Sequence, residues 1–439
     1  MNILQEGGAA LDTQARPGRA SRVPYRWRLL AALWLIIVCA VSVPSIGSSV
    51  VNAHMAAALH FDRTVIGLGF GLFILTMGVP GPLVAALIRR FGVKRVVLAG
   101  CALLVVGTLA TGTVVASSWA FPPVFGLLVG AGVACAGILP AQAAVARWFP
   151  DKRALAVSIV LSAIDIGGTF APPALDKIIA VSSLGWRAGW YAMSAAALLA
   201  LLITALVMRD DGAGEDATPS AAPFAETAHV FNTTHAWPLR DALHCRAYWL
   251  IMGFSCVVGL DWMLLMAHGV VHLVDSGYSS AAAAFAIAVM IASSLAGNLV
   301  AGLLGDRIAP HRIGAAAMAL LTMGLYAAVR PDVAAGPWLF AVPAGLGYGA
   351  SQVCLMALLG NYFGARIFAQ LFGILLAVGT LTGSALVGAA GAVFDHTGSY
   401  TPVFVLCLVL SALAVFAIAF AAPPRIPRSA QVQPANQDN

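Results

Sequence analysis

The feature that most constrains this chain is a series of twelve apolar runs, separated by turn residues or by clusters of charge. Each run is about 18 to 27 residues long, which is enough to cross a hydrocarbon core of about 30 Å as a helix. Charged residues make up only 10% of the chain, against about 25% in soluble domains, so most of its surface must face lipid. Because backbone groups in lipid must be paired within their own segment, the sequence predicts an all-α polytopic membrane protein with twelve transmembrane helices.

A single hydrophilic stretch divides the runs six and six. Between residues 209 and 246 the hydrophobicity falls, and Gly, Pro, Ser, Thr and acidic residues accumulate, a composition typical of flexible linkers. The sequence therefore predicts five parts: an N-terminal arm at 1–28, a six-helix bundle at 29–208, the linker at 209–246, a second six-helix bundle at 247–422 and a tail at 423–439.

The two predicted bundles resemble each other at a nearly constant offset along the chain. Ala53-His54 matches Ala267-His268, and Trp148-Phe149 matches Tyr362-Phe363, each 214 residues apart. Duplicated six-helix halves with a solute site near the midplane are the construction of alternating-access carriers. We therefore expect two pseudo-symmetric bundles with a site between them.

Lys and Arg are concentrated in alternate segments between the runs. Twenty of the 24 lie in segments that face the cytoplasm if the N-terminus does. The positive-inside tendency thus predicts a multi-pass protein of the cell inner membrane with both termini in the cytoplasm. The first run, from Leu29 to Val51, is longer than the apolar part of a secretory signal and is expected to be retained. The net charge of +6 reflects this topology, so nucleic acid is not an expected partner.

Two loop segments carry a recognisable pattern. Gly302-Leu303-Leu304-Gly305-Asp306-Arg307 resembles the G-x-L-x-D-R motif that follows helix eight in the major facilitator superfamily, and 85–95 resembles its degenerate counterpart after helix two. The segments 268–279 and 394–400 are similar to the monocarboxylate-porter and oxalate/formate-antiporter branch of that superfamily. The resemblance implies the major facilitator fold and transport of a small, monocarboxylate-like solute.

The same resemblance implies a way in which the two halves contact each other. In that superfamily the motif aspartate meets the N-terminus of a helix in the opposite half, where about half a positive charge resides. Here only the second motif keeps the acid, as Asp306, because Arg89 replaces it in the first. Asp306 is therefore expected to make the main cytoplasmic contact, near the start of helix five. The expected gating residues are Asp306, Arg307, Arg89, Arg90 and Arg153.

Two acidic residues are predicted at membrane depth. Asp165 lies about twelve residues, or about 18 Å, beyond Arg153 along helix five, and Asp261 lies about as far along helix seven. Burying an ionised carboxylate at this depth costs free energy unless the group contacts water, is paired or is protonated. Both acids are therefore candidates for proton coupling, and Asp165 is the stronger candidate. The alternative for each is a protonated acid that bonds a neighbouring helix.

Weaker candidates for contact with substrate or protons are Asn298, His54, His268, Tyr348, Gln352 and Gln142, for which interhelical hydrogen bonding or packing is the alternative. Asn298 stands where the resembling branch commonly carries an arginine. No Lys or Arg is predicted in the middle of any helix, so a substrate carboxylate would depend on Asn298, helix dipoles or histidines. Pro44 in helix one and Gly167-Gly168 in helix five predict helix breaks near such a site.

These features predict a secondary active transporter that moves a small organic acid by alternating access, with a proton or by exchange. A neutral or cationic solute is the alternative, and a transporter-like receptor or a membrane-embedded enzyme is less favoured. The sequence contains no H-E-x-x-H, G-x-S-x-G or P-loop motif, and its seven cysteines are scattered, so no enzyme activity, metal or cofactor is expected. The expected partners are a small-molecule substrate, protons and the lipid bilayer, with the protein as a monomer.

Overall fold

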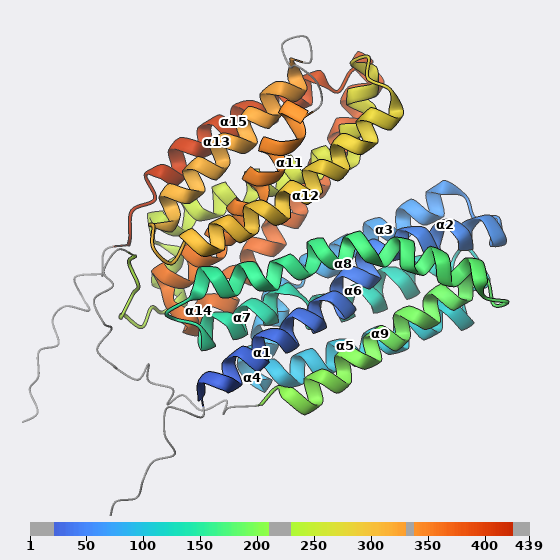
Figure 1. The fold of residues 1–439 in the computed structure, drawn as a ribbon, viewed down its shortest axis with the longest axis horizontal. Coiled ribbons are helices and arrows are strands. Elements are labelled where there is room, and N and C mark those ends of the chain that lie inside the picture. The colour runs from blue at the N-terminus through green and yellow to red at the C-terminus, as the bar shows by residue number, and fades with distance from the viewer. Residues whose placement is uncertain (1–21, 210–229, 331–337, 425–439) are drawn as a thin grey trace, which may run out of the picture.

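The computed structural model describes residues 22–209, 230–330 and 338–424, and within these ranges it contains helices and no strands. The helices form two bundles that lie side by side, the first coloured blue to green and the second yellow to red (Figure 1). The boundary between the bundles falls between α9 and α11, where the sequence turns hydrophilic. The all-α prediction is confirmed.

Six membrane-crossing units make up the first half, and three of them consist of more than one segment. In chain order the segments are α1 (Arg22–Ile37), the π-helix η2 (Val38–Gly47) and α2 (Ser48–Leu59); α3 (Arg63–Gly78) and α4 (Gly81–Phe91); α5 (Val93–Thr113); the π-helix η3 (Pro122–Val129), α6 (Gly130–Ala136) and α7 (Ile138–Trp148); α8 (Arg153–Val181); and α9 (Trp186–Val207).

The short helix α10 (Leu239–Leu243) precedes the second half. The second half consists of α11 (Arg246–Asp275), α12 (Ser280–Leu304), α13 (Pro310–Val329), α14 (Trp338–Thr397) and α15 (Thr401–Ala419). The long α14 is two helices joined at Gly364, whose φ of 77° and ψ of 172° are not helical. Glycine adopts this conformation without the strain that a Cβ atom would bring.

The number of membrane crossings agrees with the sequence. Ten helical segments of the described chain are long and apolar enough to span a bilayer, and the bent pair Thr64–Gly78 and Gly81–Phe91 makes an eleventh. One of the ten is the 56-residue stretch Leu339–Phe394, which Gly364 divides into two spans. The described residues therefore account for twelve crossings, six in each half.

The helix irregularities agree only in part with the sequence. Helix one leaves α-helical geometry around Pro44, as predicted, because proline cannot donate the hydrogen bond that an α-helix needs. The predicted break at Gly167-Gly168 is wrong, since α8 runs unbroken through both glycines. These glycines instead permit close packing: a Cβ atom on Gly167 would lie 2.6 Å from the Cβ atom of Ser42 in η2.

The two halves are closest at one end of the molecule. We call it the terminal end, because α1 begins, α9 ends, α11 begins and α15 ends there; towards the other, divergent end the bundles separate (Figure 1). Contacts between the halves join α12 to α8 and α14 to α3, α4, α7 and α8. The outer segment α2 packs instead on α8, α9 and η2 of its own half.

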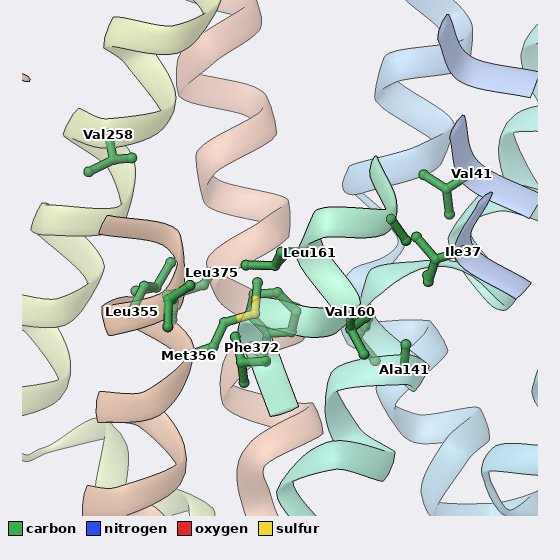
Figure 2. Close-up of a cluster of buried hydrophobic side chains, with 14 of the residues drawn as sticks. Ile37, Val41, Ala141, Val160, Leu161, Val258, Leu355, Met356, Phe372 and Leu375 are labelled. Carbon is green, nitrogen blue, oxygen red and sulfur yellow. The ribbon is translucent and has the colours of Figure 1, made fainter. Parts of the chain in front are cut away.

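A buried apolar cluster fills the space between the halves towards the terminal end. In it Leu161 of α8 lies near Met356 and Phe372 from the two parts of α14, while Val160 of α8 and Ala141 of α7 lie together on the side of the first half (Figure 2). Leu161 lies one helical turn below Asp165, and Met356 and Phe372 come from the other half. We call this set the closing cluster: Ala141, Val160, Leu161, Met356 and Phe372. All five side chains are buried, so water has little access to them in this conformation.

The predicted linker is only partly within the described residues, since 210–229 lie outside them. The remaining part carries α10 and packs on the second half. Thr233 donates its backbone N–H to the carbonyl oxygen of Asn361 at 2.8 Å, and the ring of Trp237, which is 3% exposed, lies 5.6 Å from that of Phe363. We call residues 231–237 the strap.

Candidate substrate and proton site between the halves

A hydrogen bond joins the two halves at membrane depth. The Asn298 amide on α12 donates through Nδ2 to Oδ2 of Asp165 on α8, at 2.6 Å. Asp165 is half-buried, while Asn298 is 4% exposed and its Oδ1 atom has no partner within the described residues. Two of the residues singled out by the sequence, 133 positions apart, are thus in direct contact.

Helix one packs against the part of α8 that carries Asp165. The Ser42 hydroxyl in η2 donates to the carbonyl oxygen of Ala163 at 3.0 Å, and Gly167 allows η2 to approach α8 closely. A π-helical stretch is frequent at functional sites, because it redirects side chains and frees backbone groups. Here it brings the irregular part of helix one to the depth of Asp165.

An aromatic pair from the second half lies near the Asp165–Asn298 contact. The Trp262 ring on α11 is stacked on the Tyr348 ring on α14, with centroids 3.8 Å apart and planes 12° apart. Gln352, one turn further along α14, donates to the Tyr348 hydroxyl at 3.0 Å. Gly349, the residue after Tyr348, packs on α12, where an added Cβ atom would lie 3.0 Å from the backbone nitrogen of Asn298, so the aromatic pair is close to the contact between the halves.

The second acid, Asp261, lies inside its own half. It is fully buried, and its Oδ2 accepts a hydrogen bond from the Ser411 hydroxyl on α15 at 2.6 Å. Its Oδ1 has no partner within the described residues. In this conformation Asp261 is therefore hydrogen bonded to α15 and is not part of the Asp165–Asn298 contact.

The two candidate histidines lie at the divergent end. His54 Nε2 is 2.8 Å from Oδ1 of Asp176 in a half-exposed pair that joins α2 to α8, and His54 lines a cavity of about 420 Å³. His268 is stacked on Tyr400 with ring centroids 4.5 Å apart, within the second half. His54 pairs with Asp176, about three helical turns beyond Asp165 on α8, and His268 lies about one and a half turns beyond Trp262 on α11, so both lie towards the divergent end.

Gln142 lies near a break in helix four that the sequence did not reveal. It is fully buried on α7, and neither of its amide atoms has a partner within the described residues. α7 begins after Gly137, whose φ of −91° and ψ of −144° break helix four. Pro140, three residues later, is the only local signal, since proline is common in the first turn of a helix. Helix four is thus discontinuous near the middle of its span.

The motif acid makes its contact at the terminal end. The Asp306 carboxylate accepts from the backbone N–H groups of Ala154 at 2.9 Å and of Leu155 at 3.2 Å, in the first turn of α8. Burial raises the pKa of Asp306, and the two hydrogen bonds partly oppose this shift. Next to it, the buried Arg153 donates to Oδ1 of Asn361 at 2.5 Å, which ties α8 to the residue that holds the strap.

The other predicted gating residues make no such contact. Arg89 and Arg90 are exposed at the C-terminal end of α4, where basic side chains suit the helix dipole, and the Arg90 guanidinium lies over the neighbouring Phe91 ring. Arg307 is also exposed. Within the described residues no group of three His, Cys, Asp or Glu side chains could hold a metal ion.

Comparisons with known proteins agree with this architecture. The profile of the Major Facilitator Superfamily matches residues 32–384. Human monocarboxylate transporter 11 is 27% identical over 380 residues, 82% of this chain and 76% of that protein. The uncharacterized transporter YycB of Bacillus subtilis is 23% identical over 90% of this chain and 92% of its own length.

Solved structures show the same fold. The Escherichia coli fucose:proton symporter FucP matches with a TM-score of 0.67 at 16% identity, over 91% of this chain and 98% of that one. The proton:xylose symporter XylE matches with a TM-score of 0.71 at 15% identity, over 91% and 97%. The chain belongs to the major facilitator superfamily, and it is a multi-pass membrane transporter, not an enzyme.

Proposed function

We propose that this transporter moves a small organic acid together with a proton, and that Asp165 carries the proton. The observation that supports this most is the 2.6 Å hydrogen bond between Asp165 and Asn298, because it joins the two halves. Any change in the charge of Asp165 then acts directly on the contact between the halves that must rearrange in alternating access.

Electrostatics links the proton to the substrate. An ionised Asp165 repels an incoming carboxylate, and a half-buried site strengthens that repulsion relative to water. A proton on Asp165 removes it, so anion and proton bind best together. Asn298 suits either state: its amide nitrogen donates to the ionised acid, and its unpartnered Oδ1 can accept from the protonated one after an amide flip.

Similarity to other carriers supports the same substrate class. Monocarboxylate transporters 11 and 13 are among the relatives, and FucP and XylE are both proton symporters. We further propose an inner-membrane monomer with both termini and the 209–246 linker in the cytoplasm. The terminal end then faces the cytoplasm, and the conformation described here is closed inside and faces outward.

A neutral or cationic solute is the second candidate. One observation favours it: the Trp262–Tyr348 pair belongs to the part of α14 that packs against Asn298, the partner of Asp165, and a carboxylate together with aromatic rings is how proteins commonly bind organic cations. Under this alternative the ionised Asp165 would attract the substrate directly.

Transport in proteoliposomes separates the two. For an organic acid, the Asp165→Asn variant should keep binding and counterflow but lose accumulation driven by a pH gradient. Accumulation of the acid by this variant with unchanged pH dependence would contradict the proposal. For a cation, the same substitution should abolish binding itself, since it removes the attracting charge.

A further inference from the structure

We infer that the stacked Trp262–Tyr348 pair is a specificity surface for a flat, unsaturated or aromatic group on the substrate. The inference rests on the proposed function, since it specifies which organic acids the site accepts. It assigns the polar end of the substrate to Asp165 and Asn298 and the flat end to the indole ring.

The depth of the pair excludes the common reason for a tryptophan in a membrane helix. Trp residues usually lie near helix ends, where they anchor the helix at the lipid headgroups. Trp262 instead lies in the middle of α11, which runs from Arg246 to Asp275. Its ring remains half-buried while stacked on Tyr348, so it is not enclosed in the core of its own half.

Tyr348 holds the indole ring in a fixed orientation. Its hydroxyl accepts a hydrogen bond from Gln352, so the hydroxyl proton is left to donate to another group. Gly349, the residue after Tyr348, packs against Asn298 on α12, so this donor comes from the part of α14 that packs on the polar contact. A substrate carboxylate can thus accept a hydrogen bond from Tyr348, while the proton on Asp165 is held by Asn298 Oδ1, which has no partner within the described residues.

Ring-on-ring contact distinguishes flat groups from saturated groups of the same size. Aromatic pairs contribute about 0.5–1.5 kcal/mol beyond the area they bury, which corresponds to a factor of about 2 to 13 in affinity. An aliphatic ring of equal volume gains the buried area but not this term. The site should therefore favour an aromatic acid over its saturated counterpart, and both over a two-carbon acid.

The test is isothermal titration calorimetry of the full-length purified protein with benzoate, cyclohexanecarboxylate, acetate and benzylamine at one pH. Benzoate should bind about three- to tenfold more tightly than cyclohexanecarboxylate. Trp262→Phe, which keeps a flat ring, should retain most of this preference. Trp262→Leu, which keeps an apolar side chain for packing, should bring the two affinities to within a factor of two.

The outcomes separate the inference from the proposed function. Equal affinity for benzoate and cyclohexanecarboxylate, or a preference that survives Trp262→Leu, overturns the specificity surface and leaves the organic-acid proposal intact. Binding of benzylamine without binding of any carboxylate overturns both, since the site then takes a cation. An unchanged thermal midpoint of Trp262→Leu shows that a lost preference is not a loss of folding.

Discussion

Two junctions close the terminal end, and they occupy equivalent positions in the two halves. In the polar junction α12 meets α8, through Asp306 at the first turn of α8 and through Asn298 at Asp165. In the glycine junction α4 meets the second part of α14, where Gly81 and Gly373 touch backbone to backbone. Equivalent helices thus meet through hydrogen bonds on one side and through the absence of side chains on the other.

The difference between the two junctions indicates that each has its own role in closure. A glycine contact depends on shape alone, so it responds to neither pH nor ligand charge, and it sets how closely the halves can approach. A contact that includes two carboxylates changes when a proton or an anion arrives. The asymmetry originates in the sequence, because the first motif carries Arg89 where the second carries Asp306.

The largest effect is expected from a side chain added to the glycine junction. A Cβ atom on Gly81 would collide with the Gly373 carbonyl oxygen, and backbone cannot rotate away. Overpacking costs about 1–3 kcal/mol, so Gly81→Ala should reduce the closed population about 5- to 150-fold. The measurement is the labelling rate of a cysteine placed at Ala141 in the closing cluster, in a chain without other reactive cysteines.

Gly302 provides the matched substitution in the polar junction. Its added Cβ atom would meet the Ser158 side chain, so Gly302→Ala should be rescued by Ser158→Gly. The Gly81→Ala variant has no such rescue. Equal labelling of Ala141→Cys in the wild-type and Gly81→Ala backgrounds would refute the steric account of that junction.

The next effect concerns the helix contact of Asp306. Hydrogen bonds to charged groups contribute about 1.5–3 kcal/mol, but the burial that raises the pKa of Asp306 offsets part of this gain. Asp306→Ala should therefore weaken closure by about 1 kcal/mol, or roughly fivefold in the same labelling assay. Arg89→Ala at the equivalent position is the control, and it should change the rate less than twofold.

A smaller effect is expected at the Asn298 bridge. Asn298→Leu removes the hydrogen bond between the halves and puts an apolar side chain of similar size in its place, so closure should weaken by about 0.5 kcal/mol, or roughly two- to threefold. Asn298→Asp places two acids together, and these should share one proton at neutral pH. The uptake rate of Asn298→Asp should then depend more steeply on pH than that of the wild type.

The smallest effect should come from the strap. Thr233 accepts a hydrogen bond from the Trp237 indole N–H at 3.2 Å, and its own N–H holds Asn361, the partner of Arg153. Thr233→Ala should weaken the contact between the strap and Asn361. The labelling rate of Ala141→Cys in the closing cluster should then rise about twofold. Ser399→Ala at the divergent end is the control, and an identical rate for the two variants would show that the strap does not support closure.

Much of this architecture could be predicted from the sequence. The twelve spans, the two halves and the depth of Asp165 follow from apolar runs, a hydrophilic linker and residue counting along a helix, which are local properties. The Asp165–Asn298 contact joins residues 133 positions apart, so each could be proposed separately, but their pairing depends on how α8 and α12 pack.

Other features of the site had weak or misleading local signals. Gly137 breaks helix four, whereas Gly167-Gly168, which has more glycine and nearby prolines, leaves α8 intact. In α8 the absence of a side chain at Gly167 allows η2 to pack closely, and the helix itself stays continuous. Trp262 was not predicted as part of the site, because a tryptophan in an apolar run gives no sign of which face it occupies.

The central claim is that the proton on Asp165 controls the contact between the halves. Protonation removes the charge from the hydrogen bond with Asn298, so acidification should shift the population away from the conformation described here. His54 and Asp176 form a second ionic contact, at the divergent end, so the measurement is made in a His54→Gln background as well.

The distance between the halves at the divergent end can be measured by pulsed electron spin resonance. The two spin labels are placed at Ala57 on α2 and Val274 on α11, which are both exposed. The account predicts a distance distribution that shifts to shorter values as the pH falls in the wild type and in His54→Gln. In Asp165→Asn it predicts one distribution at every pH. A pH-dependent shift of equal size in Asp165→Asn would contradict the claim.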